Sequence, residues 1–149
     1  MTEQTANRIR IFSLNEANTC LPLVRVIVRD IVQMSNSILE CRQRLDFLRD
    51  GRDDFEQDMY EDELDHMEDS LESDAMQLKA YIAELHELGV EIKSLTEGQI
   101  DFPSLIGGQM VYLCWKYDEP TVDFWRELED NFSRRQPIEL MFRDAASLE

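Results

Sequence analysis

Apolar residues in the first third of the chain recur at spacings that alternate between three and four. The series consists of Val24, Ile27, Ile31, Met34, Ile38, Cys41, Leu45 and Leu48, and no polar residue interrupts it. Such spacings place side chains on one face of an α-helix, and their alternation is typical of a coiled-coil seam. The pattern therefore predicts a long helix that presents this seam to a second helix.

The start of this helix has its own signals. Ser13 and Glu16 match a capping box, in which each side chain accepts a hydrogen bond from the backbone amide of the other residue. Pro22 lacks an amide hydrogen and would break an ongoing helix. We therefore expect residues 14–21 to be separated by a kink from a helix that restarts at Pro22.

A second seam of the same kind follows a turn. Residues 50–52 supply turn chemistry, and Asp53 with Glu56 offers another capping box, so the second helix is expected to start near Asp54. Gly89 provides a natural stop. The seam between them consists of Tyr60, Leu64, Met67, Leu71, Asp74, Leu78, Tyr81, Leu85 and Leu88.

The polar member of this seam, Asp74, leaves two arrangements open. If a tight loop joins antiparallel helices, Leu45 faces Tyr60 and Asp74 is buried, which requires a partner for its carboxylate. The candidate partners on the first helix are Arg29 and Arg25. Alternatively the seam rotates there, so that Asp74 is exposed and Ala75 is buried.

After Gly89 the period changes from that of a helix to that of a strand. Apolar and polar residues alternate over residues 90–93 and 100–102. Gly107 and Gly108 lie between two further runs of this kind, which is a strong signal for a two-residue hairpin turn. These patterns predict short antiparallel strands.

The last part of the chain is less regular. Residues 121–126 alternate well enough for a strand, although residues 123–129 would also suit a helix. Residues 136–138 are expected to add an edge strand. The final residues are expected to fray or to form a short helix.

Together these elements predict an α+β protein in which a small antiparallel β-sheet packs at the base of a long antiparallel helical hairpin, a coiled coil. A length of 149 residues suits one domain. We divide residues 1–149 into a hairpin over 13–89 with an acidic tip near 50–58, a sheet over 90–140 and a tail over 141–149.

Charge changes this picture most around the turn of the hairpin. The formal net charge is −17, and thirteen carboxylates against Arg52 alone lie between Asp50 and Asp74. Nucleic acid and anionic membranes are poor partners for such a chain, because binding them requires clustered Lys and Arg. Basic protein surfaces or divalent cations remain, unless the charge only maintains solubility. The candidate interaction residues of the tip are Asp50, Asp53, Asp54, Glu56 and Asp58.

The cysteines indicate a compartment. Cys20, Cys41 and Cys114 are odd in number and have no CxxC spacing, which is typical of reduced cysteines in a cytoplasmic protein. The N-terminal sequence has no apolar stretch long enough for a signal peptide, and no window approaches a membrane span.

Motifs for catalysis or metal binding are weak. Glu63 and His66 have the ExxH spacing of di-iron bundles, but His86 has no matching glutamate. They are weak metal candidates, and a solvated helix face is the simpler interpretation. No HExxH, GxSxG, P-loop or GxGxxG motif occurs. The sequence indicates no cofactor and leans against an enzyme without excluding one.

Aromatic, acidic and guanidinium side chains gather in the C-terminal part. Together such groups can bind an anion or a peptide, because stacking and bidentate hydrogen bonding operate side by side. The structural interpretation is that the tryptophans are core residues and that the arginines pair with Asp101 and Glu119. The candidate ligand or interaction residues are Asp101, Trp115, Glu119, Trp125, Arg134 and Arg135, and Arg126 lies among them.

Several motifs in order resemble the uncharacterised bacterial family known as domain of unknown function 2203. They are Phe-Ser-Leu-Asn-Glu-Ala-Asn at 12–18, Leu-Pro-Leu-Val-Arg at 21–25, Glu-Leu-Gly-Val-Glu-Ile-Lys at 87–93, Asp-Phe-Pro-Ser at 101–104, Val-Tyr-Leu-Cys-Trp-Lys at 111–116 and Arg-Gln-Pro-Ile at 135–138. The resemblance implies a small cytosolic protein. A Trp-His pair of the family pattern is here Trp125-Arg126, a Gly-Glu turn is Asp118-Glu119, and a glycine is Asn131. Without the histidine, a ligand-binding or structural role fits that position better than catalysis or metal binding.

The leading functional hypothesis is a non-enzymatic interaction or regulatory module whose acidic hairpin binds a basic protein. In shape it is analogous to bacterial transcript-cleavage factors, which carry an acidic coiled-coil tip into RNA polymerase, and the analogy lies at the level of the fold alone. A ligand-binding protein or enzyme using the C-terminal residues is a second hypothesis. A structural homodimer, with the arginine-richer first helix at the interface, is a third.

Overall fold

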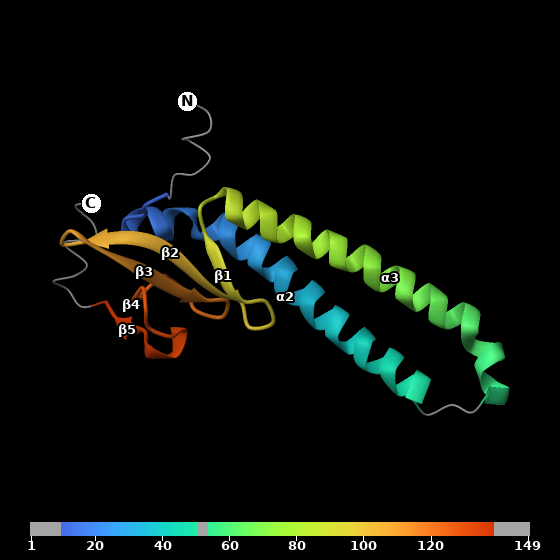
Figure 1. The fold of residues 1–149 in the computed structure, drawn as a ribbon. Coiled ribbons are helices and arrows are strands. Elements are labelled where there is room, and N and C mark those ends of the chain that lie inside the picture. The colour runs from blue at the N-terminus through green and yellow to red at the C-terminus, as the bar shows by residue number, and fades with distance from the viewer. Residues whose placement is uncertain (1–9, 51–53, 139–149) are drawn as a thin grey trace.

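A computed structural model describes residues 10–50 and 54–138, with the backbone alone for residues 54–60. Two long helices, α2 (Leu14–Asp50) and α3 (Asp54–Glu87), form an antiparallel hairpin, and a sheet packs against its base (Figure 1). The expected α+β layout is therefore confirmed. α2 alone has 37 residues, a length of about 55 Å, so much of the hairpin projects beyond the sheet as an arm.

The N-terminus of α2 is capped as its sequence predicts. The amide of Ser13 donates to Glu16 Oε1 at 3.1 Å, and the amide of Glu16 donates to Ser13 Oγ at 3.0 Å. The expected restart at Pro22 is wrong, because α2 runs as one helix from Leu14 to Asp50. Pro22 is exposed while Leu21 and Val24 are buried on either side, so core packing holds the helix through the missing hydrogen bond.

The buried residues of the two helices include members of both predicted seams. Leu45 and Leu64 are buried toward the tip, and Ile31 and Leu85 are fully buried nearer the base. Asp74 fits neither expected arrangement, because both it and Ala75 are half-buried. The proposed arginine partners lie elsewhere: Arg29 pairs with Asp30, and Arg25 donates to the carbonyl of Pro120 at 2.9 Å.

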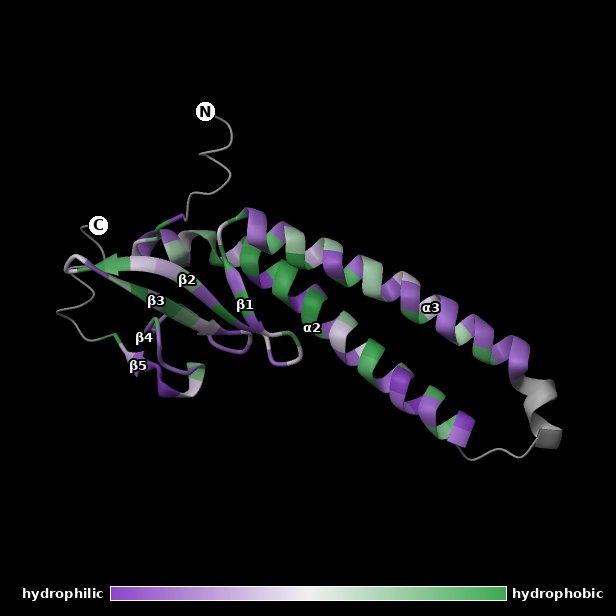
Figure 2. Ribbon diagram, in the orientation of Figure 1, coloured by the Kyte–Doolittle hydropathy of each residue, from purple (hydrophilic) through white to green (hydrophobic). Residues whose placement is uncertain are grey.

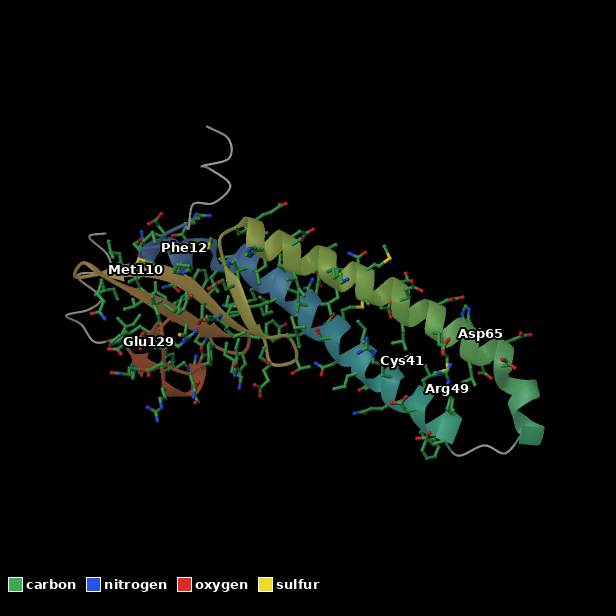
Figure 3. All side chains as sticks on the ribbon, viewed as in Figure 1. Phe12, Cys41, Arg49, Asp65, Met110 and Glu129 are labelled. Atoms are coloured by element: carbon green, nitrogen blue, oxygen red, sulfur yellow. The ribbon has the colours of Figure 1, made fainter. Side chains whose placement is uncertain are left out.

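The helices are also offset from the expected register. That register would place Arg49 level with Glu56, which is about 18 Å along the helix from Glu68. Instead Arg49 forms an ion pair with Glu68. Figure 3 shows Arg49 and Asp65 at the same end of the arm. Asp53 of the second predicted capping box lies outside the described residues.

α3 ends in a Schellman motif centred on Gly89. The amide of Gly89 donates to the carbonyl of His86 at 2.9 Å, and the amide of Val90 donates to the carbonyl of Leu85 at 3.3 Å. Gly89 has a φ of 89°, and a Cβ there would lie 2.7 Å from Arg10 Cβ. Glycine is therefore required both by the positive φ and by the close approach of Arg10.

The sheet is a five-stranded antiparallel meander with the strand order β1-β2-β3-β4-β5. Gly107 and Gly108 join β2 to β3, and both have positive φ values, 58° and 80°, as a type I′ hairpin turn requires. The segment whose sequence suited either a strand or a helix forms strand β4, and the expected edge strand is present as β5. The strands are β1 (Glu91–Ser94), β2 (Gln99–Ile106), β3 (Gln109–Lys116), β4 (Phe124–Glu127) and β5 (Gln136–Pro137).

One face of the sheet packs against α2 and forms the core. Alternate residues of β2 and β3, among them Ile100, Phe102, Leu113 and Trp115, belong to one buried cluster with residues of α2. The segment before α2 is tied to β2, since the amide of Phe12 donates to the carbonyl of Pro103 at 2.8 Å. In Figure 2 the apolar residues gather where sheet and helices meet, whereas the arm is largely hydrophilic.

The β1–β2 turn marks how far the sheet covers α2. A Cβ on Gly98 in this turn would lie 3.0 Å from Val28 and 3.1 Å from Val32. One helical turn further along, Asn36 Nδ2 donates to the carbonyl of Thr96 at 3.4 Å. The rest of α2, residues 37–50, extends beyond the sheet (Figure 1).

Candidate functional site

The two helices of the arm differ sharply in charge. α2 carries five arginines and five carboxylates, so its formal charge is zero. α3 carries thirteen carboxylates and one lysine, Lys79, which gives a formal charge of −12. Most of the net charge of −17 is thus carried by one helix.

Four carboxylates form a straight row on the exposed face of α3, which we call the acidic stripe: Glu61, Asp65, Asp69 and Glu72. Their spacings of four, four and three place them on one side of the helix. All four are exposed, and Met76, which is 69% exposed, continues the row toward the base. Within the described residues, α3 makes one ion pair, between Glu68 and Arg49.

The residues predicted for the acidic tip are only partly described. Asp50 is exposed at the end of α2. Asp53 lies outside the described residues, as do the side chains of Asp54, Glu56 and Asp58. The weak metal candidates Glu63 and His66 are both exposed on α3. No group of three or more potential metal ligands occurs in the part of the chain that the structure describes.

A second concentration of charge lies on the outer face of the sheet, away from α2. Asp101 on β2 points to this face because its neighbours Ile100 and Phe102 point into the core. Its carboxylate forms an ion pair with Arg126 of β4, across the intervening strand β3, and the two side chains are 0% and 5% exposed. Arg126 also donates to the carbonyl of Asp130, in the segment that follows β4.

Burial has the larger effect on Asp101, whereas the pKa of Arg126 is raised because its hydrogen bond and ion pair with Asp101 outweigh burial. Burial raises the pKa of Asp101, and the hydrogen bond from Arg126 partly opposes that increase. Burial also raises the pKa of the Cys114 thiol, which lies opposite Asp101 on β3, and the carboxylate adds to this effect. Tyr112 on β3 stacks against Arg126, with the guanidinium carbon 4.7 Å from the ring centre. A cysteine in these surroundings is a poor nucleophile.

Glu119 and Arg135 form a separate ion pair. Arg135 Nη1 and Nη2 donate to the two carboxylate oxygens of Glu119 at 2.8 and 2.5 Å, a bidentate geometry. The Arg135 guanidinium also lies over the rings of Phe124 and Phe132, at 4.3 and 4.7 Å from the ring centres. Glu119 Oε1 accepts a further hydrogen bond from the amide of Lys116 at 2.9 Å. These bonds fix the β3–β4 connection to the chain near β5.

The predicted C-terminal residues therefore do not meet in one place. Trp115 is fully buried in the core, and its indole nitrogen donates to the carbonyl of Glu119 at 2.8 Å. Trp125 packs against the same core, and Arg134 is exposed. Asp101 pairs with Arg126, not with Arg134 or Arg135. Strand alternation alone would have placed Asp101 and Arg126 on the same face, had the β2–β3–β4 register been known.

A family model described as an uncharacterized conserved protein, domain of unknown function 2203, matches residues 10–138. The chain belongs to this family. Comparison with curated proteins gives no match, and comparison with solved structures gives none. Arg126, for which the sequence favoured a ligand-binding or structural role over catalysis, is the buried partner of Asp101.

No described helix of this family member is long and apolar enough to cross a membrane.

Proposed function

We propose that this protein is a non-enzymatic interaction module whose arm binds a basic surface of a partner protein through α3. The observation that carries the proposal is the acidic stripe, a row of four exposed carboxylates on a helix of formal charge −12. A field of one sign on a projecting element speeds association with an oppositely charged partner and restricts the choice of partner.

The isolated protein gains no stability from this row of charges. Like charges three or four residues apart on a helix repel each other by about 0.2–0.5 kcal/mol per pair. Within the described part of α3, only the charge of Glu68 is balanced by an ion pair, with Arg49. A basic partner would convert this repulsion into attraction. A net charge that served solubility alone would not need to be concentrated on one helix of the hairpin.

The shape of the molecule favours the same function. The stripe lies on the part of the hairpin that projects beyond the sheet, where the body of the protein leaves it accessible (Figure 1). Met76, next to the stripe, supplies an exposed apolar contact of the flexible kind found at protein-binding surfaces. A basic helix or groove with one apolar position would complement both features.

The C-terminal residues support a structural role. Both Nη atoms of Arg135 donate hydrogen bonds to Glu119. Arg126 forms an ion pair with Asp101 and donates to the backbone of the segment that follows β4. These pairs fasten the loops of the sheet to one another. A sheet fastened in this way would hold the base of the arm rigidly, and the helices would bind the partner.

The experiment compares three immobilised proteins as baits for partners in cell extract. The first is the wild type, and the second carries Glu61→Gln, Asp65→Asn, Asp69→Asn and Glu72→Gln. The control carries Glu→Gln changes at four exposed positions away from the stripe, so that its net charge matches that of the second protein. These positions are Glu84, Glu87, Glu127 and Glu129.

The proposal expects one or more basic proteins that bind the wild type and the control and are lost from the stripe variant. The affinity for a purified partner should fall as salt increases. Equal retention by all three proteins would show that net charge alone acts, and no specific retention by the wild type would remove the proposal.

RNA polymerase is the first purified partner to test, because of the analogy in shape with transcript-cleavage factors. Asparagine at Asp50, Asp53 and Asp54 should abolish its binding if the tip enters the enzyme. Binding that survives this change, but not the stripe variant, would assign recognition to the side of the arm.

A further inference from the structure

The end of α2 has a pattern of side chains that reads the same in both directions. Gln43 is its centre. Arginines lie one residue away on each side (Arg42 and Arg44), and carboxylates lie three residues away (Glu40 and Asp46). Large apolar residues lie four residues away, and these are Leu39 and Phe47.

These residues form one exposed face of α2. Leu39, Gln43 and Phe47 are spaced by four, which aligns them along the helix. Leu39 is 47% and Phe47 76% exposed, so this face carries two large exposed apolar side chains, one helical turn on either side of Gln43. Cys41 and Leu45, two residues from the centre, belong to the seam that faces α3, so the exposed face lies on the opposite side of α2.

The charges on the two flanks of this face have no partner of their own within the described residues. The ion pairs of the described residues involve none of the four charged side chains, Glu40, Arg42, Arg44 and Asp46. Helical spacing places Glu40 and Arg44 on one flank, and Arg42 and Asp46 on the other. Each flank thus carries one charge of each sign.

We propose that two copies of this chain associate through this face, with their α2 helices antiparallel and the two-fold axis at Gln43. Leu39 then packs against Phe47 of the second copy, and Phe47 against its Leu39. On one flank Glu40 meets Arg44 of the second copy, and on the other Arg42 meets its Asp46. A two-fold interface must be complementary to itself, and this pattern is.

The shape of the molecule supports the same axis. The sheet covers α2 only as far as Asn36, which donates to the carbonyl of Thr96 in the β1–β2 turn. The sheet leaves residues 37–50 of α2 uncovered, and the midpoint of this segment lies next to Gln43. An axis at Gln43 brings residue 50 of the second copy level with residue 36. Each uncovered segment, about 21 Å long, therefore fits between the β1–β2 turn and the tip of the other copy.

The acidic helices do not oppose this association strongly. α2 has no net charge, and α3 lies on the far side of each arm from the contact. Four helices in a row separate the two α3 axes by about three interaxial distances, or roughly 25–30 Å. This exceeds the screening length of about 8 Å at physiological salt. The acidic stripe stays exposed in the dimer, so this inference does not depend on the proposed function.

Sedimentation equilibrium over a range of concentrations tests the interface. We expect the wild type to form a dimer and Phe47→Glu to weaken it at least tenfold. The control is Met76→Glu, an equally drastic change at a comparably exposed position on α3, and it should behave as the wild type. Helical circular dichroism checks that both variants are folded. A monomeric wild type at the highest concentration reached, or equal behaviour of the two variants, would overturn the proposal.

A charge exchange tests the orientation of the helices. Glu40→Arg alone and Arg44→Glu alone should each weaken self-association by about tenfold, because each places like charges across the interface. Mixed in equal amounts, these two variants should form a heterodimer. The double variant Glu40→Arg/Arg44→Glu should again form a homodimer. If the mixture stays as dissociated as its components, the antiparallel arrangement about Gln43 is wrong.

Discussion

Removing the charges of the acidic stripe is expected to stabilise the isolated protein, although it should abolish partner binding. The variant is the one proposed above, with amides in place of Glu61, Asp65, Asp69 and Glu72. These positions lie beyond the first turn of α3, so their charges gain little from the helix dipole. Amides also have helix propensities close to those of the acids. Relief of repulsion should therefore dominate.

The size of the effect follows from the spacing. Between Glu61 and Glu72, six pairs of carboxylates lie three or four residues apart and include a member of the stripe: 61 with 65, 62 with 65, 65 with 68, 65 with 69, 68 with 72 and 69 with 72. At about 0.2–0.5 kcal/mol each, their removal adds roughly 1–3 kcal/mol at low salt. For a chain of this size, 1 kcal/mol corresponds to about 3–4 °C in the melting temperature.

Thermal unfolding by circular dichroism, at about 10 mM and about 1 M salt, measures this gain. At the higher ionic strength the screening length falls to about 3 Å, and the difference between wild type and variant should nearly vanish. The control, which removes a single such pair at positions 84 and 87, should gain a small fraction of the stabilisation. A stripe variant no more stable than the wild type at low salt, or equally stabilised at both salt concentrations, would refute the reasoning.

Three further predictions concern the body of the protein. Asp101→Ala leaves Arg126 buried without its partner and should cost about 3–5 kcal/mol in urea denaturation, whereas replacing both by Leu should cost less. The Cys114 pKa is raised above its ordinary value of 9.0, so above pH 9 the unfolded chain loses a proton that the folded protein keeps. Stability should fall by up to about 1.4 kcal/mol per pH unit there, and Cys114→Ala should remove this part of the loss. Gly89→Ala should destabilise more than Gly107→Ala, because a Cβ at Gly89 meets another side chain and a Cβ at Gly107 meets none. Gly107→Ala should cost about 1–2 kcal/mol of backbone strain.

Most of the fold could be predicted from local patterns. The seam spacing located both helices, the capping box located the start of α2, and Gly89 located the end of α3. The Gly107-Gly108 turn located the central hairpin of the sheet. Each of these signals depends on residues close together in sequence, so local interactions are enough to place the element.

The errors in the fold arose where distant packing competes with a local rule. Pro22 disfavours a helix locally, but the buried residues around it hold α2 together. The offset between the helices, seen in the Arg49–Glu68 pair, depends on how two whole surfaces interlock. Loop chemistry at the turn does not contain that information.

The candidate residues divide in the same way. The sequence by itself determined that the negative charge lies on the outward face of one helix, because helical spacing assigns residues to faces without knowledge of the partner. Tertiary structure alone decided the pairing of Asp101 with Arg126 and of Glu119 with Arg135. Those contacts depend on strand register and on where a loop returns, and both are set by the balance of many distant contacts. Tertiary structure also decided that the sheet covers α2 only as far as Asn36, which leaves the rest of this helix uncovered.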